Sequence, residues 1–186
     1  MDKFIVETSA RHCHLSKEDL YTLFGDGYEL TKKKDLSQPG QFACEEKVVV
    51  VGEKSEIQMS ILGPVRSKTQ VEVSLTDARN IGVNAPIRES GDLKDAGKCK
   101  IRGPMGEISL DNAVISAKRH IHATPTDANK LNIKNGDIVK VLVDSPDRKL
   151  IFDDVVVRVN ENYSLAMHID TDESNACFGA KEGYIV

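Results

Sequence analysis

Arg119-His120-Ile121-His122-Ala123-Thr124-Pro125-Thr126-Asp127 is a short strand pattern that runs directly into the start of a helix. Thr124 is a good helix N-cap, Pro125 suits the first helical position, and an acidic residue follows three positions after the cap. The same arrangement occurs earlier in the chain as Arg11-His12-Cys13-His14-Leu15-Ser16, with Asp19 three residues beyond the serine. A shared R-H-x-H followed by the same cap at the same spacing indicates a duplicated unit.

Two further segments show the same order of strand, N-cap and helix. They are Glu72 with Ser74 and Asp77, and His168 with Asp170 and Glu173. In addition, Thr76–Ala78 repeats Thr126–Ala128 letter for letter. Capping boxes are common, so four unrelated caps are the alternative interpretation. If the unit occurs four times, the residues at equivalent strand ends are His14, Glu72, His122 and His168. Two copies in each half would predict a pseudo-symmetric pair of small domains produced by internal duplication.

Short segments rich in β-branched residues dominate the chain. The predicted strands are Phe4–Ser9, Lys47–Val51, Ile57–Leu62, Gln70–Leu75, Ala113–Ala117, Ile138–Val143, Leu150–Val159 and Ser164–Ile169. The clearest predicted helices are Lys17–Phe24 and Pro125–Leu131. Many short strands between Gly, Asp, Asn and Pro turns are typical of barrels, so we predict a mainly β fold of two small β-barrel domains capped by short α-helices.

The predicted division is one barrel half over residues 1–98 and a second over residues 99–186. The first half contains the first H-x-H with Arg66 and Glu72, and the second half contains the second H-x-H with His168. The N-terminal strand could pack with the other half. The stretch Ala85–Gly106, with two prolines and four glycines, is the predicted linker.

The composition excludes several classes of protein. Hydrophobic residues make up 40% of the chain and charged residues 29%, and the net charge of −4 gives no basic footprint for nucleic acid. Apolar runs such as Val48–Val51 are far shorter than the roughly 20 residues of a membrane span. The N-terminus lacks a signal-peptide pattern and the four cysteines form no C-x-x-C pair, so we expect an intracellular protein without disulfides.

The histidine pairs point to metal binding. Residues i and i+2 of a strand share a face, so His12 projects with His14 and His120 with His122, while the residue between each pair turns into the core. A lone histidine more often has a structural role than a metal-binding one, but two such pairs favour metal coordination. The fifth histidine, His168, also precedes a cap. Five imidazoles and one carboxylate exceed one tetrahedral shell, so two metal ions are predicted, with zinc favoured by the donors.

A guanidinium and an ammonium precede Glu72 in the stretch Arg66-Ser67-Lys68. Arginine binds phosphate through two parallel hydrogen bonds, so an anion site is one interpretation and a charged turn is the other. Cys13 is a weak candidate nucleophile because its strand parity directs it away from the histidines. The chain contains neither a Walker A loop nor a G-x-G-x-x-G that opens a helix.

Several motifs together closely resemble the PduL-type phosphate acyltransferases, the phosphotransacylases linked to propanediol and ethanolamine-type metabolism and often found within bacterial microcompartments. The matching segments are Ser9–Ser16, Gly63–Glu72, Ala85–Gly91, Lys118–His122 and Met167–Ala176. The resemblance covers the chain from about Val6 to Ala176.

This resemblance implies two barrels capped by short helices, two zinc ions, and exchange of CoA for phosphate on an acetyl or propanoyl group. It implies that one zinc is held by His12, His14, Glu72 and His168, and the second by His120 and His122. It assigns phosphate binding to Arg66, and it places at the CoA site Thr8, Ser9, Ala10 and Asn175. One metal would act on the thioester carbonyl or on the departing thiolate.

The resemblance bears on location as well. Family members destined for a compartment lumen often carry an N-terminal extension, and only eleven residues precede His12 here. The expected location is therefore the cytoplasm or a microcompartment, and a homodimer and association with a microcompartment both stay open. The sequence does not distinguish acetyl from propanoyl substrates, since one methylene contributes only about 1–3 kcal/mol in a pocket.

Two rival functions remain at this point. His12-x-His14 followed by Glu18 imitates a cupin string, which would indicate a metal hydrolase, oxygenase or isomerase, but the glycine expected before the string is missing. Glu18 also falls at the start of a predicted helix, where a carboxylate interacts favourably with the helix dipole. The other rival is a non-catalytic metal-binding module, which would show no open coordination position.

Overall fold

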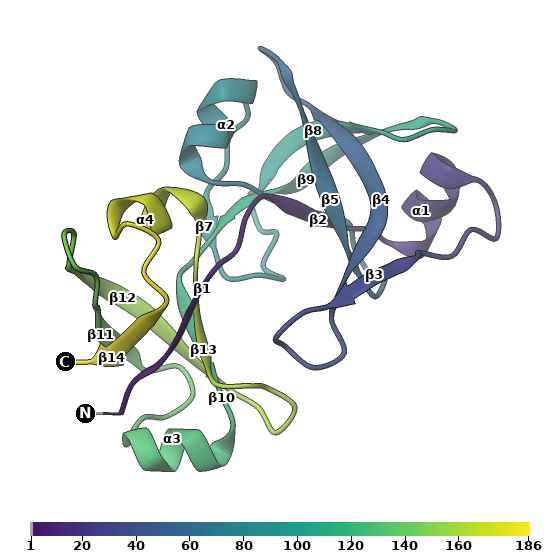
Figure 1. Cartoon of the computed structure of the whole chain (residues 1–186). Coiled ribbons are helices and arrows are strands. Elements are labelled where there is room, and N and C mark those ends of the chain that lie inside the picture. The colour runs from purple at the N-terminus through teal and green to yellow at the C-terminus, as the bar shows by residue number, and fades with distance from the viewer. Residues whose placement is uncertain (1) are drawn as a thin grey trace. The chain divides into compact units, whose positions relative to one another are not determined.

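The computed structural model describes residues 2–186, and the chain divides into two compact units, each containing a β-barrel (Figure 1). The central unit is Arg11–Ala117. The terminal unit combines the N-terminal segment through Ala10 with Lys118–Val186. No helix in the described part of the chain is long and apolar enough to cross a membrane.

The central unit is a closed ring of six strands. Going round the ring, they are β2 (His12–His14), β5 (Glu56–Gly63), β4 (Phe42–Val51), β8 (Gly97–Arg102), β9 (Glu107–Ala117) and β6 (Gln70–Glu72), which returns to β2. Two short strands lie outside the ring, with β3 (Lys32–Asp35) paired to β4 and β7 (Ile87–Arg88) paired to β9. Its helices are α1 (Lys17–Phe24) and α2 (Leu75–Ile81).

The terminal unit is also a closed six-stranded barrel. Its strands are, in order, β1 (Phe4–Thr8), β13 (Ala166–Ile169), β10 (His120–Ala123), β12 (Leu150–Val159), β11 (Ile138–Val143) and β14 (Glu182–Ile185). Its helices are α3 (Pro125–Leu131) and α4 (Thr171–Ala176). The predicted mainly β fold of two barrels with short helices is therefore confirmed.

The two barrels share one pattern of strand pairing. β2 runs parallel to β5 and antiparallel to β6, and β6 runs parallel to β9. In the same way, β10 runs parallel to β12 and antiparallel to β13, and β13 runs parallel to β1. The other three pairs of each ring are antiparallel. Strand for strand, β2, β4, β5, β6, β8 and β9 correspond to β10, β11, β12, β13, β14 and β1, as internal duplication predicts.

All four predicted caps are present. Each cap side chain accepts a hydrogen bond from the backbone N–H three residues further on, which satisfies a donor that the helix itself leaves unpaired. The cap residues are Ser16, Ser74, Thr124 and Asp170. Each cap follows a strand that ends at or just after one of the candidate ligands, so the fourfold strand–cap–helix unit is confirmed.

The cores fill from alternate residues of the strands. Cys13 of β2 and Ile121 of β10 are fully buried in the central and terminal cores respectively, as their strand parity predicts. Burial raises the pKa of the Cys13 thiol strongly, so this residue is an apolar core group and not a nucleophile. The residues on either side of each core residue therefore project from the outside of their barrel.

The predicted linker Ala85–Gly106 is wrong, because it contains β8, which pairs with both β4 and β9 and closes the central barrel. The predicted division between residues 98 and 99 falls within this strand, whereas the two units meet in sequence at Ala10 and again at Ala117. The predicted strand Gln70–Leu75 ends at Glu72, because Ser74 is already a helix cap.

Candidate metal centres and the residues around them

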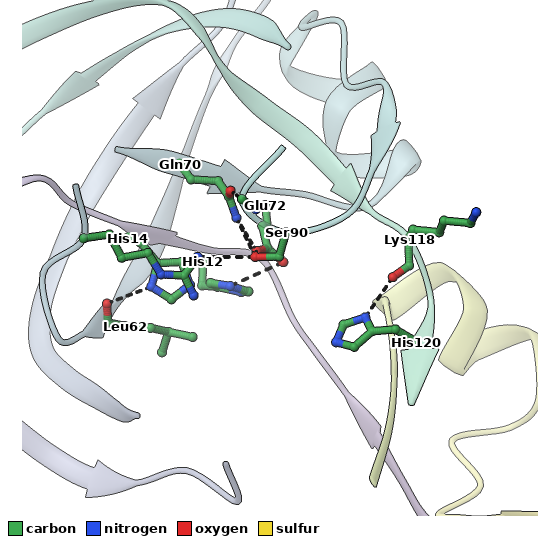
Figure 2. A network of polar contacts seen from close by, with 10 residues as sticks. His12, His14, Leu62, Gln70, Glu72, Ser90, Lys118 and His120 are labelled. Carbon is green, nitrogen blue, oxygen red and sulfur yellow. Dashed lines mark hydrogen bonds and ion pairs between the residues drawn. The ribbon is translucent and has the colours of Figure 1, made fainter. Parts of the chain in front are cut away.

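The first group of candidate ligands lies in the central unit and consists of His12, His14 and Glu72. Strands β2 and β6 are antiparallel neighbours, and His12 lies directly opposite Glu72. His12 Nε2 is 3.5 Å from Glu72 Oε2, and one ligand atom from each of the three residues lies within 4.8 Å of the others. Figure 2 shows the two imidazoles beside the carboxylate. We call this group the central trio.

The second group lies in the terminal unit and consists of His120, His122 and His168. Here β10 and β13 are the antiparallel neighbours, with His120 directly opposite His168. The three rings pack against one another with centroids 4.6 to 5.1 Å apart. Their ligand atoms also lie within 4.8 Å of one another. We call this group the terminal trio.

This grouping of candidate ligands differs from the division of ligands that the family resemblance implies. The resemblance placed His168 with His12, His14 and Glu72, whereas the structure groups it with His120 and His122. The reason is strand pairing, since β13 lies next to β10 in the same barrel. By strand equivalence, His168 occupies the position in the terminal barrel that Glu72 occupies in the central barrel.

The protonation states of His14 and His122 suit metal binding. Burial, with the nearby charge of His12 and Arg66, lowers the pKa of His14 to about 3. Burial, with the charge of His120 and His168, lowers the pKa of His122 to about 2. Both rings are therefore neutral at physiological pH, and a neutral imidazole has the lone pair that a metal ion requires.

Backbone carbonyls orient two of the rings. His14 Nδ1 lies 3.1 Å from the carbonyl oxygen of Leu62, and His120 Nδ1 lies 2.8 Å from that of Lys118 (Figure 2). A carbonyl can only accept, so in the neutral ring Nδ1 carries the proton and Nε2 offers its lone pair. Such contacts are the usual supports of metal-bound histidines.

The terminal trio also contains a buried polar atom that the protein leaves unsatisfied. His122 is 7% exposed, and its Nδ1 has no hydrogen-bond partner among the described residues. A buried unpaired nitrogen is costly unless a ligand satisfies it. Together with the nitrogen and carboxylate donors of both trios, this atom fits a borderline divalent cation at each trio.

A hydrogen-bond network holds the carboxylate of Glu72. Ser90 Oγ donates to Glu72 Oε1 at 2.8 Å, and the side-chain amide of Gln70 donates to the same oxygen (Figure 2). Burial alone raises the pKa of Glu72, but its interactions with His12, His14 and Ser90 outweigh burial and hold the pKa below its ordinary value. Glu72 is therefore an ionised carboxylate.

Arg66 lies beside this network. Its guanidinium donates to Ser90 Oγ at 3.3 Å, and its charge contributes to the lowered pKa of His14. Its backbone N–H donates to the carbonyl of Leu15 at 2.9 Å, which ties the loop before β6 to the end of β2. The structure thus brings the predicted anion-binding arginine to the central trio, whereas the neighbouring Lys68 is exposed.

Sequence reasoning missed the roles of Ser90 and Gln70. Ser90 lies within a segment that carries the family resemblance, but its sequence distance from Glu72 hides the contact. Gln70 could have been found by parity, because it precedes Glu72 by two residues on β6 and therefore shares its face.

The residues expected at the CoA site all lie in the terminal unit. Thr8 ends β1, and its hydroxyl donates to Ser174 Oγ of α4 at 2.7 Å. The N–H of Ser9 donates to the carbonyl of Ile169 at 2.8 Å. Asn175 follows Ser174 on α4 and is exposed. This places the segment that ends at Ala10 beside the start of α4.

The arginines of the two R-H-x-H motifs have a structural role that the sequence did not reveal. Arg11 Nη1 lies 3.1 Å from both carboxylate oxygens of Asp77, in the first turn of α2. Arg119 Nη1 lies 3.0 Å from Glu173 Oε1, in the first turn of α4. Each ion pair therefore ties an H-x-H strand to the helix that follows the third ligand of its trio.

Two barrels of one topology, each with a three-residue site of metal-binding donors, define a duplicated β-barrel protein with a candidate divalent-metal centre in each barrel. Comparison with known proteins narrows this class. The profile of the family described as phosphate propanoyltransferase matches residues 5–180. The chain belongs to this family and is an enzyme of it.

Individual relatives agree over nearly the whole chain. The phosphate propanoyltransferase of Thermotoga maritima is 56% identical over 173 residues, covering 92% of this chain and 82% of the relative. That of Clostridioides difficile is 53% identical over 173 residues, with the same coverage of 92% and 82%. That of Enterococcus faecalis is 51% identical over 186 residues, covering 98% and 88%. The resemblance stated from the motifs is confirmed, and the cupin and non-catalytic alternatives are set aside.

Proposed function

We propose that this enzyme is a zinc-dependent phosphate acyltransferase that interconverts a short acyl-CoA and phosphate with the acyl phosphate and CoA, the acyl group being acetyl or propanoyl. The family supplies the reaction class. The observation that carries the metal dependence and the phosphate role is the arrangement in the central unit, where Ser90 joins the Arg66 guanidinium to the ionised Glu72 of the central trio.

Zinc is the metal that the donors favour. Imidazole nitrogen with at most one carboxylate is a typical zinc ligand set, and three protein ligands leave a coordination position open for substrate. His12, His14 and Glu72 would hold one ion, and His120, His122 and His168 the other. When bound, zinc supplies positive charge that can polarise an acyl carbonyl and stabilise a thiolate.

The reaction needs phosphate held in place against its own charge. In the proposed reaction a phosphate oxygen forms a bond to the acyl carbon, the carbon–sulfur bond breaks, and the electron pair leaves with the CoA sulfur. Arg66 would bind the phosphate, and its fixed attachment to Ser90 aligns the guanidinium in advance. Thr8, Ser9, Ala10 and Asn175 would bind CoA.

Direct attack by phosphate is favoured over an acyl-enzyme. All four cysteines are buried. The pKa of Cys99 is raised by burial to about 12, and that of Cys44 to about 11, so neither thiol is an ionised nucleophile. Transfer in one step requires no protein nucleophile.

The test is release of free thiol from acetyl-CoA and propanoyl-CoA, with and without phosphate, before and after removal of metal by a chelator. We expect release that depends on phosphate, stops after chelation and returns when zinc is restored. Release that persists in the metal-free protein would refute the metal dependence.

Arg66→Ala tests the phosphate role in the same assay. Loss of a charge-assisted contact worth about 1.5–3 kcal/mol should lower kcat/KM for phosphate roughly tenfold to a hundredfold, while zinc content stays at the wild-type level. Lys68→Ala is the matched control, because it removes an exposed cation two residues away. Equal phosphate dependence in the Arg66→Ala and Lys68→Ala variants would rule out the role.

A further inference from the structure

Glu7 occupies an informative position in the terminal barrel. Because the two barrels share one topology, each residue beside the third ligand of one trio has a counterpart in the other barrel. In the central barrel, β6 pairs in parallel with β9, and Glu72 lies next to Ile115. In the terminal barrel, β13 pairs in parallel with β1, and His168 lies next to Glu7. Glu7 therefore stands where the central barrel has a buried isoleucine.

The side chain of Glu7 lies beside the His168 ring, on the side of its Nδ1. Its Oε2 lies 3.6 Å from His168 Nδ1, and the His168 side chain is 14% exposed. This separation is a close polar contact but is too long for a hydrogen bond. A carboxylate facing Nδ1 favours the tautomer with its proton on Nδ1, which leaves Nε2 of His168 free to bind a metal.

The two trios differ in the number of negative charges that they place directly on a metal. The central trio contributes one carboxylate, Glu72, and two imidazoles. The terminal trio contributes three imidazoles, which are neutral when they act as ligands. A divalent ion would therefore keep a net charge of about +1 among the ligands of the central trio and about +2 among those of the terminal trio.

We propose that Glu7 is a positioning residue for the metal of the terminal trio, and that it supplies from behind His168 the single negative charge that Glu72 supplies directly in the other barrel. This inference rests on the metal chemistry of the proposed function. The carboxylate fixes the ring of His168 and makes its Nε2 a more basic ligand. It also offsets part of the charge that three neutral ligands leave on the ion.

The carboxylate occupies opposite members of one pair of neighbouring positions in the two barrels. Where the third ligand is Glu72, the adjacent strand offers Ile115, which is fully buried and carries no charge. Where the third ligand is His168, the adjacent strand offers a carboxylate. At these two paired positions each barrel thus has one carboxylate, and its place in the pair sets whether it acts as a ligand or as a support.

The test is the affinity of each metal site in the full-length Glu7→Gln variant, measured by titration with a zinc chelator and elemental analysis. Loss of a carboxylate that supports a metal-bound histidine typically weakens metal affinity about tenfold to a hundredfold. We expect this loss for one of two zinc ions, with the second ion held as in the wild type. Glu72→Gln should weaken the other ion, so the two substitutions should combine additively.

Two control variants separate the contact from general effects of charge and folding. Glu182→Gln removes a carboxylate from β14 of the same barrel, where it pairs with Lys3, and should leave both affinities unchanged. Glu7→Asp keeps the negative charge and should recover part of the lost affinity. The thermal unfolding of the metal-free Glu7→Gln protein should match that of the metal-free wild type, which shows that the barrel still closes.

The outcomes distinguish this inference from the proposed function. A wild-type protein that binds no zinc would overturn the proposed metal chemistry, and this inference with it. A wild type with two tightly held ions, and a Glu7→Gln variant that releases both with wild-type affinity, would overturn this inference alone.

Discussion

His14 and His122 keep their lone pairs because the protein makes their protonation unfavourable. Burial lowers both pKa values, and positive neighbours lower them further, to about 3 and about 2. In the unfolded chain both imidazoles would titrate near pH 6.5. Protons therefore bind the unfolded state in preference to the folded one between these values.

This difference predicts how the stability of the metal-free protein depends on pH. The contribution of the two neutral histidines to the free energy of unfolding is fully present above about pH 6.5. It falls as the pH drops toward the folded pKa values, by up to about 1.4 kcal/mol per pH unit for each histidine. Urea unfolding at about pH 7, 6 and 5 should show a steadily lower midpoint. His14→Gln should make this dependence shallower, because it removes one of the two groups. A midpoint that stays constant over this range would show that the two histidines are not held neutral.

At the scale of single elements, the Arg11–Asp77 and Arg119–Glu173 ion pairs link strands and helices that are distant in sequence. The Arg119 guanidinium also lies over the ring of Phe152, 5.3 Å from its centroid. Both pairs are partly exposed, with the Arg119 and Glu173 side chains 28% and 21% accessible, so water screens much of their attraction.

The Arg119–Glu173 pair should therefore contribute a modest but measurable coupling. In a double-mutant cycle of Arg119→Ala and Glu173→Gln, we expect an interaction energy of about 0.5–1 kcal/mol from urea unfolding. A second cycle with Arg119→Ala and the exposed Glu161→Gln should give none. Strict additivity in the first cycle would mean that the pair does not help to hold α4 against β10.

Local signals in the sequence identified much of the site. The H-x-H pairs, the caps and the parity of Cys13 each depend on a few consecutive residues, and all are found as predicted. The strand β8 also has a local signal, since Cys99 and Ile101 are buried between exposed cations. Glycines and prolines around it hid that alternation and led to the incorrect linker.

The rest of the site depends on which strands become neighbours, and this is not written locally in the chain. The grouping of His168 with His120 follows from the pairing of β13 with β10. The contact of Ser90 with Glu72 joins residues 18 positions apart. Long-range pairing is set by the closure of each barrel as a whole, so single motifs predict the ligands but not their partners.

At the scale of the whole molecule, the two barrels differ in how one antiparallel strand pair is connected. In the central barrel, β8 and β9 are consecutive and form a hairpin. In the terminal barrel, the equivalent β14 and β1 pair in the same antiparallel way but lie at opposite ends of the chain. The terminal barrel is therefore completed by a strand that precedes the entire central unit.

Moving this strand should restore the connection found in the central barrel. A permuted chain that begins at Arg11 and carries residues 2–10 after Val186, joined by a short glycine-rich linker, should unfold with nearly the wild-type midpoint, because closing a short loop costs little. Deleting residues 2–8 without reattachment should unfold the terminal barrel selectively, as seen by urea unfolding and circular dichroism. A deletion variant as stable as the wild type would show that β1 is dispensable.

The late completion of the terminal barrel has a consequence during synthesis on the ribosome. β1 leaves the exit tunnel before the whole central unit, whereas its neighbours β13 and β14 are translated after that unit. At about 5–20 residues per second, this strand would wait on the order of ten to thirty seconds with its backbone edge unpaired. Phe4 and Val6, which are buried in the folded barrel, would be exposed during that time, so this unpaired strand edge is prone to associate with other chains. Nascent-chain aggregation and chaperone capture should therefore concentrate on β1.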